Sequence, residues 1–494
     1  MIVMKFGGAS LASLASIRRV ASIVQSQVHR NPIVIVSAIG DTTDQLLAIL
    51  EHASRAQSYL AWKLQEEVKT YHFCLAEDLL GPEQLEPIDR YIRQTFRDLH
   101  VRMLEVCEGE SSVTPELRDW VAGLGEKLSS RMAAAAFQQH GLNATHLDST
   151  KLILTDENFT NAAPRYWETY ARIRWAVPLA ARTHVVVLGG FIGATEDGRA
   201  TTLGRGGSDL TASIVGAAVN AEEIQVWKDV DGVLTWDPKI KSGGYRLTSV
   251  SYEEATELAQ AGATILHPET IGPAQRLRIP VIIRNTFRPD GEGTRIGITK
   301  IACTNPVKSI VCKTNMTVVE LRSPGVNAIA AEYYQELERI CREQKAATLL
   351  AVSDEVIYLA LDSGRSDPGA TFALDRCVEA HVRTGQAIIT LVGQTSKRCN
   401  VVAHLCAVLP RRSALILPQD GESCSVRVVV AQEELAACLE ILRRTFFTQV
   451  DQAFFASIEL APEQRDTRSP EIASEERQSF GVRTGRFALP GMRP

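Results

Sequence analysis

Apolar runs of strand length alternate with amphipathic segments in the N-terminal part of the chain. Residues 2–6 form one such run, which ends at Gly7-Gly8. After Ser10, a predicted N-cap, apolar residues recur at helical spacing, and residues 32–37 form a second apolar run. The order strand, glycine turn, helix, strand indicates a βαβ unit. Strands without polar alternation are typical of a parallel sheet covered on both faces.

The segment that follows is mostly helical from residue 45 to residue 140, and further strands then come at intervals. The clearest is 184–188, which ends in Gly189-Gly190 and so repeats the glycine turn of the first strand. The pattern also predicts strands at 145–149, 152–154, 224–229 and 281–285, a helix at 164–182, and a hairpin at 230–239 with Asp-Gly at its bend.

The order of predicted strands and helices changes after residues 289–297. We interpret this polar, glycine-rich segment as the first domain boundary. Beyond it a β-α-β-β-α pattern occurs twice, which is typical of ferredoxin-like units. After residue 459 the chain is rich in Glu, Arg, Ser and Pro, and we expect a disordered tail at 459–494. The predicted strands are 309–321, 348–352, 356–361, 387–392, 414–417 and 425–430, and the predicted helices are 327–343, 370–383, 401–409 and 432–446.

Composition narrows the function classes. The chain of 494 residues is 45% hydrophobic, and its net charge of −5 gives no basic surface for nucleic acid or an anionic membrane. No run approaches the roughly 18 apolar residues of a membrane span, and the N-terminus lacks the pattern of a secretory signal. The 10 cysteines contain no Cys-x-x-Cys pair, so neither a disulfide framework nor a metal site is indicated. We expect a soluble, cytoplasmic protein of several domains.

The side chains that could bind a substrate or a phosphate lie at glycine-rich turns. Residues 201–209 place Arg205 and Asp209 around three glycines at the start of a predicted helix. A guanidinium suits a carboxylate, a carboxylate suits an ammonium, and glycine lets backbone N–H groups approach phosphate. A helix-capping turn with an incidental ion pair explains the same residues. Lys5, at the carboxyl end of the first strand, is either a phosphate contact or an ordinary charged strand end.

These segments in this order closely resemble aspartate kinase, from residue 1 to about 450, including paired regulatory ACT units. The most specific motif is Thr-x-Leu-Gly-Arg-Gly-Gly-Ser-Asp, and the others include Lys5-Phe6-Gly7-Gly8-Ala9-Ser10, 37–44, Gly125-Glu126, 189–193, 227–238 and His267-Pro268. The resemblance implies an α/β/α sandwich with a mostly parallel sheet at 1–296, followed by ACT units at 305–383 and 384–452.

The implied activity is transfer of the γ-phosphoryl group of ATP, with Mg²⁺, to the side-chain carboxylate of L-aspartate, giving 4-phospho-L-aspartate on the route to lysine, methionine and threonine. By similarity, Arg205 holds the α-carboxylate, Glu126 and Asp209 hold the ammonium, and Ser37 and Thr43 line the substrate pocket. Lys5 and Asp209 are the implied catalytic residues. The implied nucleotide site comprises Lys5, Gly7, Gly8, Ser10, Lys228, Asp229, Leu234 and Lys239.

The chain also departs from the family pattern. Ala9 replaces a usual Thr, Leu234 a frequent Tyr and Thr150 a common Arg. Thr264 stands where the family has a Lys that reaches the ATP phosphates. Three consequences stay open: the kinase has reduced activity, Lys239 or Lys241 compensates for the missing charge, or the chain has lost catalysis. A related kinase, such as one for acetylglutamate, and an amino-acid sensor with a decayed kinase half are the alternatives.

The regulatory part has its own departure. Lysine-sensitive relatives place an acidic residue on the strand after the first ACT helix, and residues 347–352 carry none. The effector therefore stays open between lysine and threonine. Edge-to-edge pairing of ACT units predicts a homodimer or a higher homo-oligomer.

Overall fold

The computed structural model describes residues 1–237, 244–263, 270–298, 303–322, 347–352, 356–362, 379–394, 398–409, 414–417 and 423–457. Its internal contacts divide the chain into two units, Met1–Ala456 and Ser457–Pro494. All described elements belong to the first unit, apart from the last residue of β18 (Phe455–Ser457). The predicted helix at 327–343 and the predicted tail at 459–494 lie outside the described residues.

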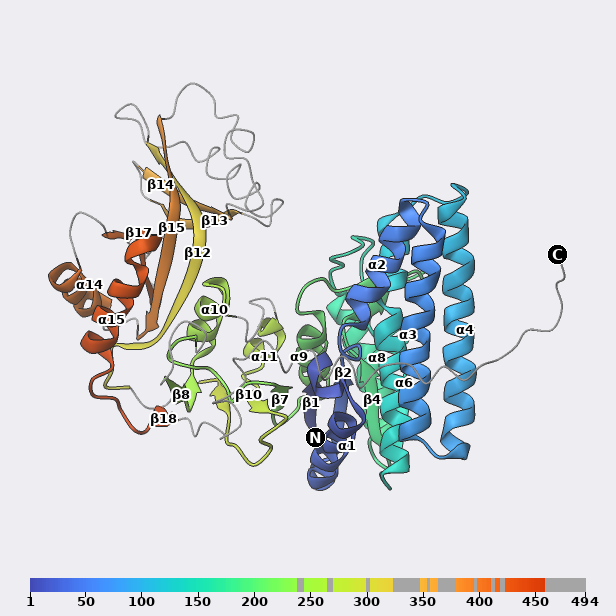
Figure 1. Cartoon of the computed structure of the whole chain (residues 1–494). Coiled ribbons are helices and arrows are strands. Elements are labelled where there is room, and N and C mark those ends of the chain that lie inside the picture. Colours follow the sequence, from blue (N-terminus) through green and yellow to red (C-terminus); the bar gives the residue numbers. More distant parts are fainter. Residues whose placement is uncertain are drawn as a thin grey trace, which may run out of the picture. The chain divides into compact units, whose positions relative to one another are not determined.

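An eight-stranded sheet organises the N-terminal part (Figure 1). Its first six strands in spatial order run parallel, β11 is antiparallel to β10, and β9 is parallel to β11. The predicted mostly parallel sheet is confirmed. In spatial order the strands are β3 (Ala144–Leu147), β4 (Val185–Gly189), β2 (Pro32–Val36), β1 (Ile2–Phe6), β7 (Ile224–Lys228), β10 (Val281–Asn285), β11 (Thr294–Ile296) and β9 (Ser249–Val250).

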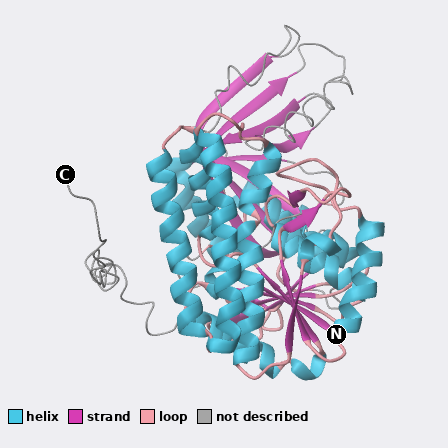
Figure 2. Ribbon diagram, turned by 90° about the vertical axis from the view of Figure 1, so that its right-hand side faces the viewer, coloured by secondary structure: helices cyan, strands magenta, loops and turns pink. Residues whose placement is uncertain are grey.

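Helices cover both faces of this sheet, which is seen nearly end on in Figure 2. Alternate residues of β1 point to opposite faces: Ile2, Met4 and Phe6 join one buried cluster, and Val3 joins the other. The first cluster includes α1 (Leu14–Ser26), α2 (Thr42–Ser54), α3 (Ser58–Leu79), α4 (Pro82–Cys107), α5 (Pro115–Ala122) and α6 (Leu124–Gln139). The second includes α7 (Ser149–Leu152), α8 (Tyr166–Ala180), α9 (Gly207–Val219), α10 (Tyr252–Gln260) and α11 (Gly272–Arg276).

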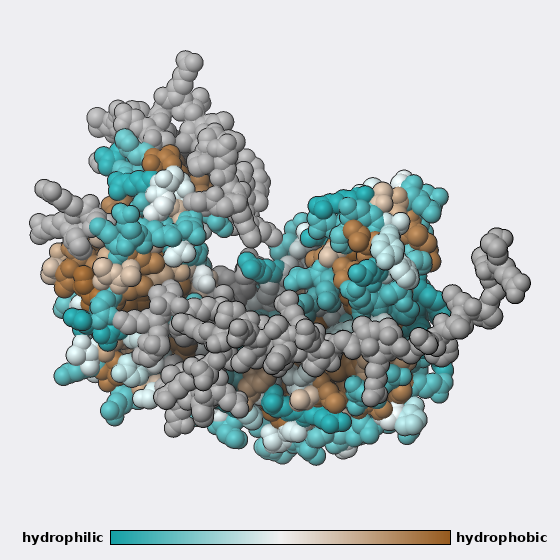
Figure 3. Space-filling view, in the orientation of Figure 1, coloured by the Kyte–Doolittle hydropathy of each residue, from teal (hydrophilic) through white to brown (hydrophobic). Residues whose placement is uncertain are grey.

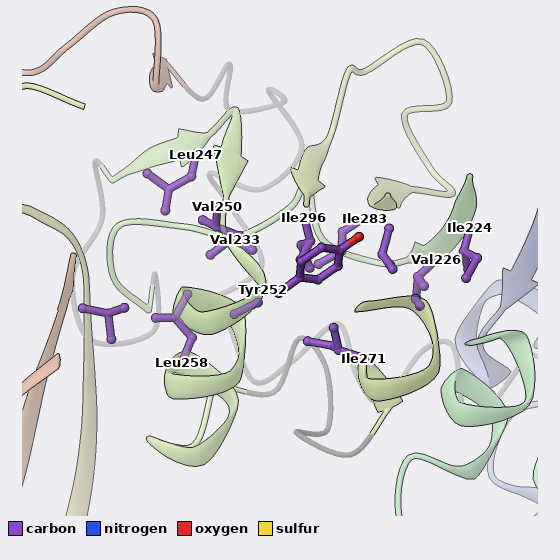
Figure 4. Packing of buried hydrophobic residues seen from close by; sticks show 14 of the residues in the cluster. Ile224, Val226, Val233, Leu247, Val250, Tyr252, Leu258, Ile271, Ile283 and Ile296 are labelled. Carbon is purple, nitrogen blue, oxygen red and sulfur yellow. The ribbon is translucent and has the colours of Figure 1, made fainter. Parts of the chain in front are cut away.

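The second cluster extends along β7 and β10. Figure 4 shows Tyr252 of α10 among the aliphatic side chains Val226, Ile283 and Ile296. Tyr252 satisfies its buried hydroxyl by donating to Ile279 O at 2.6 Å. On the face drawn in Figure 3 hydrophilic residues predominate over the described surface, with hydrophobic residues in separate patches.

Backbone hydrogen bonds join the carboxyl ends of neighbouring strands. Ser37 N donates to Phe6 O at 3.1 Å, Gly7 N to Trp227 O at 3.3 Å, and Gly190 N to Val36 O at 2.8 Å. The loops after β1, β2, β4 and β7 are therefore held together at one edge of the sheet. This is the edge at which open parallel sheets bind ligands.

A six-stranded antiparallel sheet follows, in the order β13-β14-β12-β15-β17-β16. Its two long strands run side by side and change register at Asn315 and Gly385, which both have positive φ. Helices α14 (Arg398–Val408) and α15 (Leu435–Phe446) contribute Leu405 and Leu442 to the core beneath β17. The strands are β12 (Val307–Arg322), β13 (Ala347–Val352), β14 (Val356–Asp362), β15 (Glu379–Gly393), β16 (Ala414–Leu417) and β17 (Ser425–Ala431).

Two short pairs complete the described strands. Hairpin β5 (Ile192–Ala194) and β6 (Ala200–Thr202) precedes α9, and β8 (Tyr245–Leu247) pairs with β18. Most predicted elements are confirmed within a few residues. The boundaries predicted at 296 and 383 stay predictions.

Several local predictions were wrong. Ser10 lies within a 3-10 turn (Gly8–Leu11), and it is Ser13 that caps α1 by accepting from Ser16 N at 3.1 Å. Both serines precede the periodic segment, so spacing did not separate them. No hairpin forms over residues 230–237, because the backbone of this segment pairs with β8 instead: Thr235 N donates to Tyr245 O at 2.9 Å, and Leu247 N donates to Val233 O at 2.8 Å.

Two element types were also misassigned. Residues 379–383 of the predicted helix 370–383 form the start of β15, because they pair with β12, far away in sequence; 370–378 lie outside the described residues. The strand predicted at 145–149 is confirmed as β3, which ends at Leu147. The strand predicted at 152–154 was wrong at Leu152, which ends α7; the first turn of α7 is capped by the Asp148 carboxylate, accepting from Thr150 N at 3.1 Å.

Candidate active site

Three charged side chains meet at the edge of the parallel sheet. Lys5 of β1 and Lys228 at the end of β7 both approach Asp209, which lies in the first turn of α9. Lys5 Nζ is 2.7 Å from Asp209 Oδ1, and Lys228 Nζ is 3.4 Å from Asp209 Oδ2. One buried carboxylate thus holds two lysines from neighbouring strands.

The charges shift the pKa values in this group. Burial alone would raise the pKa of Asp209, but the Lys5 and Lys228 ammonium groups outweigh it and hold that pKa below its usual value. Burial lowers the pKa of Lys228, and Lys5 adds to the effect, while Asp209 opposes it. Asp209 is therefore ionised at neutral pH, and it offsets the repulsion between the lysines.

Glu126 is a buried acid in the first turn of α6. Its Oε1 accepts from Ala38 N at 3.2 Å, whereas its Oε2 is buried and has no partner among the described residues. Burial raises the pKa of Glu126 to about 8. A buried carboxyl oxygen without a partner is rare in folded proteins and fits a ligand that supplies a donor.

The glycine-rich loop before α9 is anchored at Thr202 by hydrogen bonds to a buried carboxylate. Asp119 of α5 accepts from Thr202 N at 2.9 Å and from Thr202 Oγ1 at 2.6 Å, so that the loop starts from a fixed point. Gly204 and Gly206 follow with φ of 71° and 76°, a region that other residues rarely adopt. Arg205 lies between them, with an exposed side chain.

Lys5, Glu126, Arg205 and Asp209 line one pocket of about 330 Å³. It brings together seven residues of the predicted site: Lys5, Gly8, Ser37, Thr43, Glu126, Arg205 and Asp209. Its walls also include Ala38, Gly40 and Phe191, which the sequence analysis did not assign to the site, and residues 204 and 206–208 of the glycine-rich loop. Gly40 has a φ of 53°, so a glycine after the second strand was an available signal. Ala38 and Phe191 lie within the family motifs 37–44 and 189–193, and their membership of those motifs was the available signal.

The other predicted site residues that the structure describes do not line the pocket. Lys228 contacts Asp209 of the pocket, and Gly7 lies beside Lys5. Ser10 is buried and shares a hydrogen bond of 2.8 Å with Thr286, while Leu234 bridges to Arg246 and Asp229 is exposed. Lys239, Lys241 and Thr264 lie outside the described residues, so the predicted phosphate contacts at these positions stay predictions.

Comparison with known proteins agrees with this geometry. The family model described as "Amino acid kinase family" matches residues 1–285, which contain all of the pocket. Aspartokinase 1, chloroplastic, of Arabidopsis thaliana is 30% identical over 477 residues, covering 91% of this chain and 80% of the relative. The chain belongs to the aspartate kinases of the amino acid kinase family. The family resemblance seen in the sequence is confirmed.

Solved aspartate kinase structures share the fold over most of the chain. Escherichia coli aspartokinase III in complex with aspartate and ADP, described as the R-state, matches with a TM-score of 0.75 at 26% identity, covering 90% of this kinase and 100% of that chain. The same enzyme in complex with lysine and aspartate, described as the T-state, matches with a TM-score of 0.75 at 25% identity, covering 90% and 99%.

No helix among the described residues combines the length and the apolar content needed to cross a bilayer. Within the same ranges, no group of three or more His, Cys, Asp or Glu side chains is placed to hold a metal ion.

Proposed function

We propose that this kinase binds L-aspartate in the pocket beside β1 and α9 and phosphorylates its side-chain carboxylate with ATP. The observation that carries the proposal is the composition of one pocket: an exposed guanidinium (Arg205), a buried carboxyl oxygen without a described partner (Glu126) and a buried ammonium (Lys5). An α-amino acid with an acidic side chain offers a matching group to each.

Arg205 and Glu126 would hold the amino-acid end of the substrate. A guanidinium binds an α-carboxylate through two parallel charge-assisted hydrogen bonds. Glu126 Oε2 can accept from the substrate ammonium, and the positive charge would favour ionisation of a carboxyl whose pKa is about 8 without it. Ser37 and Thr43 line the same pocket and supply hydroxyl groups.

Asp209 would act differently from the expectation drawn from sequence. Its two oxygens face Lys5 and Lys228, so we assign it the role of holding these lysines instead of the primary contact with the substrate ammonium. Lys5 would then face the transferring phosphoryl group, with its ammonium fixed before the substrates arrive. Preorganised charge of this kind stabilises a transition state without reorganisation during the reaction.

The turn after β1 fits a phosphate. A Cβ at Gly8 would lie 2.8 Å from Gly40 O, so only glycine allows the loops after β1 and β2 to approach this closely. The aspartate carboxylate is already ionised at neutral pH, so that no general base is required. Mg²⁺ bound to the ATP phosphates would neutralise charge on the phosphoryl oxygens and align them.

The nucleotide would extend from this turn toward the end of β7. We assign Lys228, Asp229, Leu234 and Lys239 to its border, and Ser10 to support of the Gly7-Gly8 turn through Thr286. The E. coli relative was solved with ADP and aspartate together, which supports a nucleotide site beside the amino-acid site here.

The C-terminal sheet would carry feedback regulation. The E. coli relative was solved with lysine and aspartate in a T-state, which supports lysine as the first effector to test, with threonine second. We also propose a homodimer or larger homo-oligomer paired through the ACT units. A cytoplasmic location stays a prediction, and the Arabidopsis relative is described as chloroplastic.

A coupled ADP-release assay tests the substrate directly. Aspartate, glutamate and acetylglutamate are compared, each with and without lysine or threonine. We expect ADP release that saturates with aspartate, with little turnover of the other two acids. Turnover of acetylglutamate alone would favour the related kinase. Intact lysine binding without turnover of aspartate would favour the amino-acid sensor, for which the absence of the family Lys at Thr264 is the argument.

A further inference from the structure

Helix α8 carries an exposed stripe of large apolar side chains. Trp167, Trp175 and Leu179 are 83%, 78% and 58% exposed. They are spaced by eight and four residues, and Ala171, also exposed, lies midway between the tryptophans. Residues spaced by four lie on one face of a helix, so these four side chains form a single stripe, here called the Trp stripe.

The Trp stripe is not needed to attach α8 to its own domain. The opposite face of the helix buries Thr169, Ile173 and Val177, and the last two belong to the core beneath the sheet. Single exposed apolar residues are ordinary, but two tryptophans on one helix face are not. Tryptophan is also the residue type most enriched at the energetic centres of protein interfaces.

The surface available is of the right size for the centre of a dimer interface. A large aromatic side chain buries roughly 150–250 Å² when it is covered, so two tryptophans and a leucine offer about 400 Å² per copy. A stable interface takes roughly 800 Å² per partner. The Trp stripe would therefore supply the apolar centre, and polar residues around it would supply the rest.

The order of residues along α8 matches an antiparallel copy of itself. If two α8 helices cross at Ala171, the small side chains meet on the two-fold axis, and Trp167 of each copy lies level with Trp175 of the other. Glu168 and Arg172 flank the same edge of the Trp stripe. In a two-fold pair of antiparallel helices, this edge of one helix lies against the same edge of the other, which runs in the opposite direction. Each Glu168 then faces Arg172 of the other copy.

Neither charged residue is committed to a side-chain partner within the described part of the chain. Arg172 donates from Nη1 to Lys151 O at 3.3 Å, and no ion pair involves Glu168 there. We propose that α8 forms a two-fold interface with α8 of a second copy of this chain. The interface lies on the kinase domain and goes beyond the proposed function, which pairs copies through the C-terminal sheet.

Sedimentation velocity over a range of concentrations tests the interface. Two ACT-paired chains would associate further through α8, so we expect Trp167→Ala/Trp175→Ala to weaken one association step at least tenfold. Trp62→Ala is the matched control, because Trp62 is also exposed, at 47%, but lies on α3. Thermal melting checks that the variants fold. The same mass distribution for the wild type and the double variant would overturn the proposal.

Reversing the charges of Glu168 and Arg172 tests the contact between copies separately from any effect on the fold of one chain. Glu168→Arg alone should weaken the step, and Glu168→Arg/Arg172→Glu in one chain should restore it, since the opposite charges then exchange places. Ala171→Cys should form a disulfide between copies at residue 171, identified by mass spectrometry against the parent with its native cysteines. No recovery in the exchanged variant would overturn the proposal. The proposal would also be overturned if the full chain did not associate through α8 and a chain ending at Ser457 did. In that case residues 458–494, and not a second copy, would be the occupant of the Trp stripe.

Discussion

The ammonium of Lys5 lies 2.7 Å from Asp209 Oδ1, and both side chains are almost fully buried. The two residues come from the first strand and from the helix after the glycine-rich loop. Because Asp209 also contacts Lys228, it is the counter-charge for both cations beside the proposed phosphoryl site. Removal of Asp209 would leave two buried cations without their counter-charge.

Asp209→Asn preserves the shape of this group and removes its negative charge. The two lysines would then repel each other, and Lys5 would lose its fixed position. We expect kcat to fall by about 10²-fold or more, the range seen when one preorganised electrostatic contact is lost. Steady-state kinetics measure the effect, with Asp290→Asn, at an exposed loop position, as the control. An unchanged kcat would remove Asp209 from the catalytic group.

The raised pKa of Glu126 leads us to expect that the folding stability depends on pH. Its pKa is about 8 in the folded chain and about 4.3 in an unfolded one, so between these values the folded state holds a proton that the unfolded state has released. Stability from this group is complete below about pH 4 and is lost as the pH rises through 8. Denaturant unfolding should show a loss of up to about 1.4 kcal/mol per pH unit in that window.

Glu126→Gln should remove this slope, because glutamine does not titrate. The comparison is made without aspartate, since a bound ammonium would stabilise the ionised carboxylate. Equal slopes for the wild type and the variant between pH 5 and pH 8, within about 0.3 kcal/mol per unit, would show that Glu126 does not keep its proton.

Arg205→Ala should act on substrate binding. The side chain is exposed at the pocket and is assigned to the α-carboxylate, so we expect the KM for aspartate to rise at least tenfold while nucleotide affinity stays unchanged. Arg205→Lys should recover part of the loss, because an ammonium keeps the charge without the bidentate geometry. Arg182→Ala is an exposed control. A rise in the KM for ATP instead of aspartate would move Arg205 to the nucleotide.

A second buried ion pair links α10 to the C-terminal sheet. Lys308 of β12 donates to Glu254 Oε2 at 2.8 Å, and the same carboxylate accepts from Ser251 N in a capping box. Lys308→Met would leave Glu254 buried without its counter-charge and should cost about 3–5 kcal/mol of unfolding free energy. Adding Glu254→Gln should recover most of it, because glutamine still completes the capping box. A double variant less stable than Lys308→Met would contradict this account.

Sequence predicted the parts of the site that depend on strand order. Lys5, Gly8 and Arg205 meet because parallel strands bring their carboxyl ends to one edge, and the runs that form β1 and β4 were clear. What it could not give were contacts set by the tertiary fold. The two lysines around Asp209 and the burial of Glu126 depend on how α6 and α9 pack. The start of β15 depends on pairing with a strand far away in sequence.

The product gives the most direct test of the account. The kinase is incubated with ATP, Mg²⁺ and aspartate in the presence of hydroxylamine, which converts an acyl phosphate to a stable hydroxamate, and the product is analysed by mass spectrometry. The account predicts aspartyl hydroxamate at the side-chain carboxylate in proportion to ADP, with a loss of at least tenfold in Lys5→Ala. ADP release without hydroxamate, or an undiminished yield in Lys5→Ala, would contradict it.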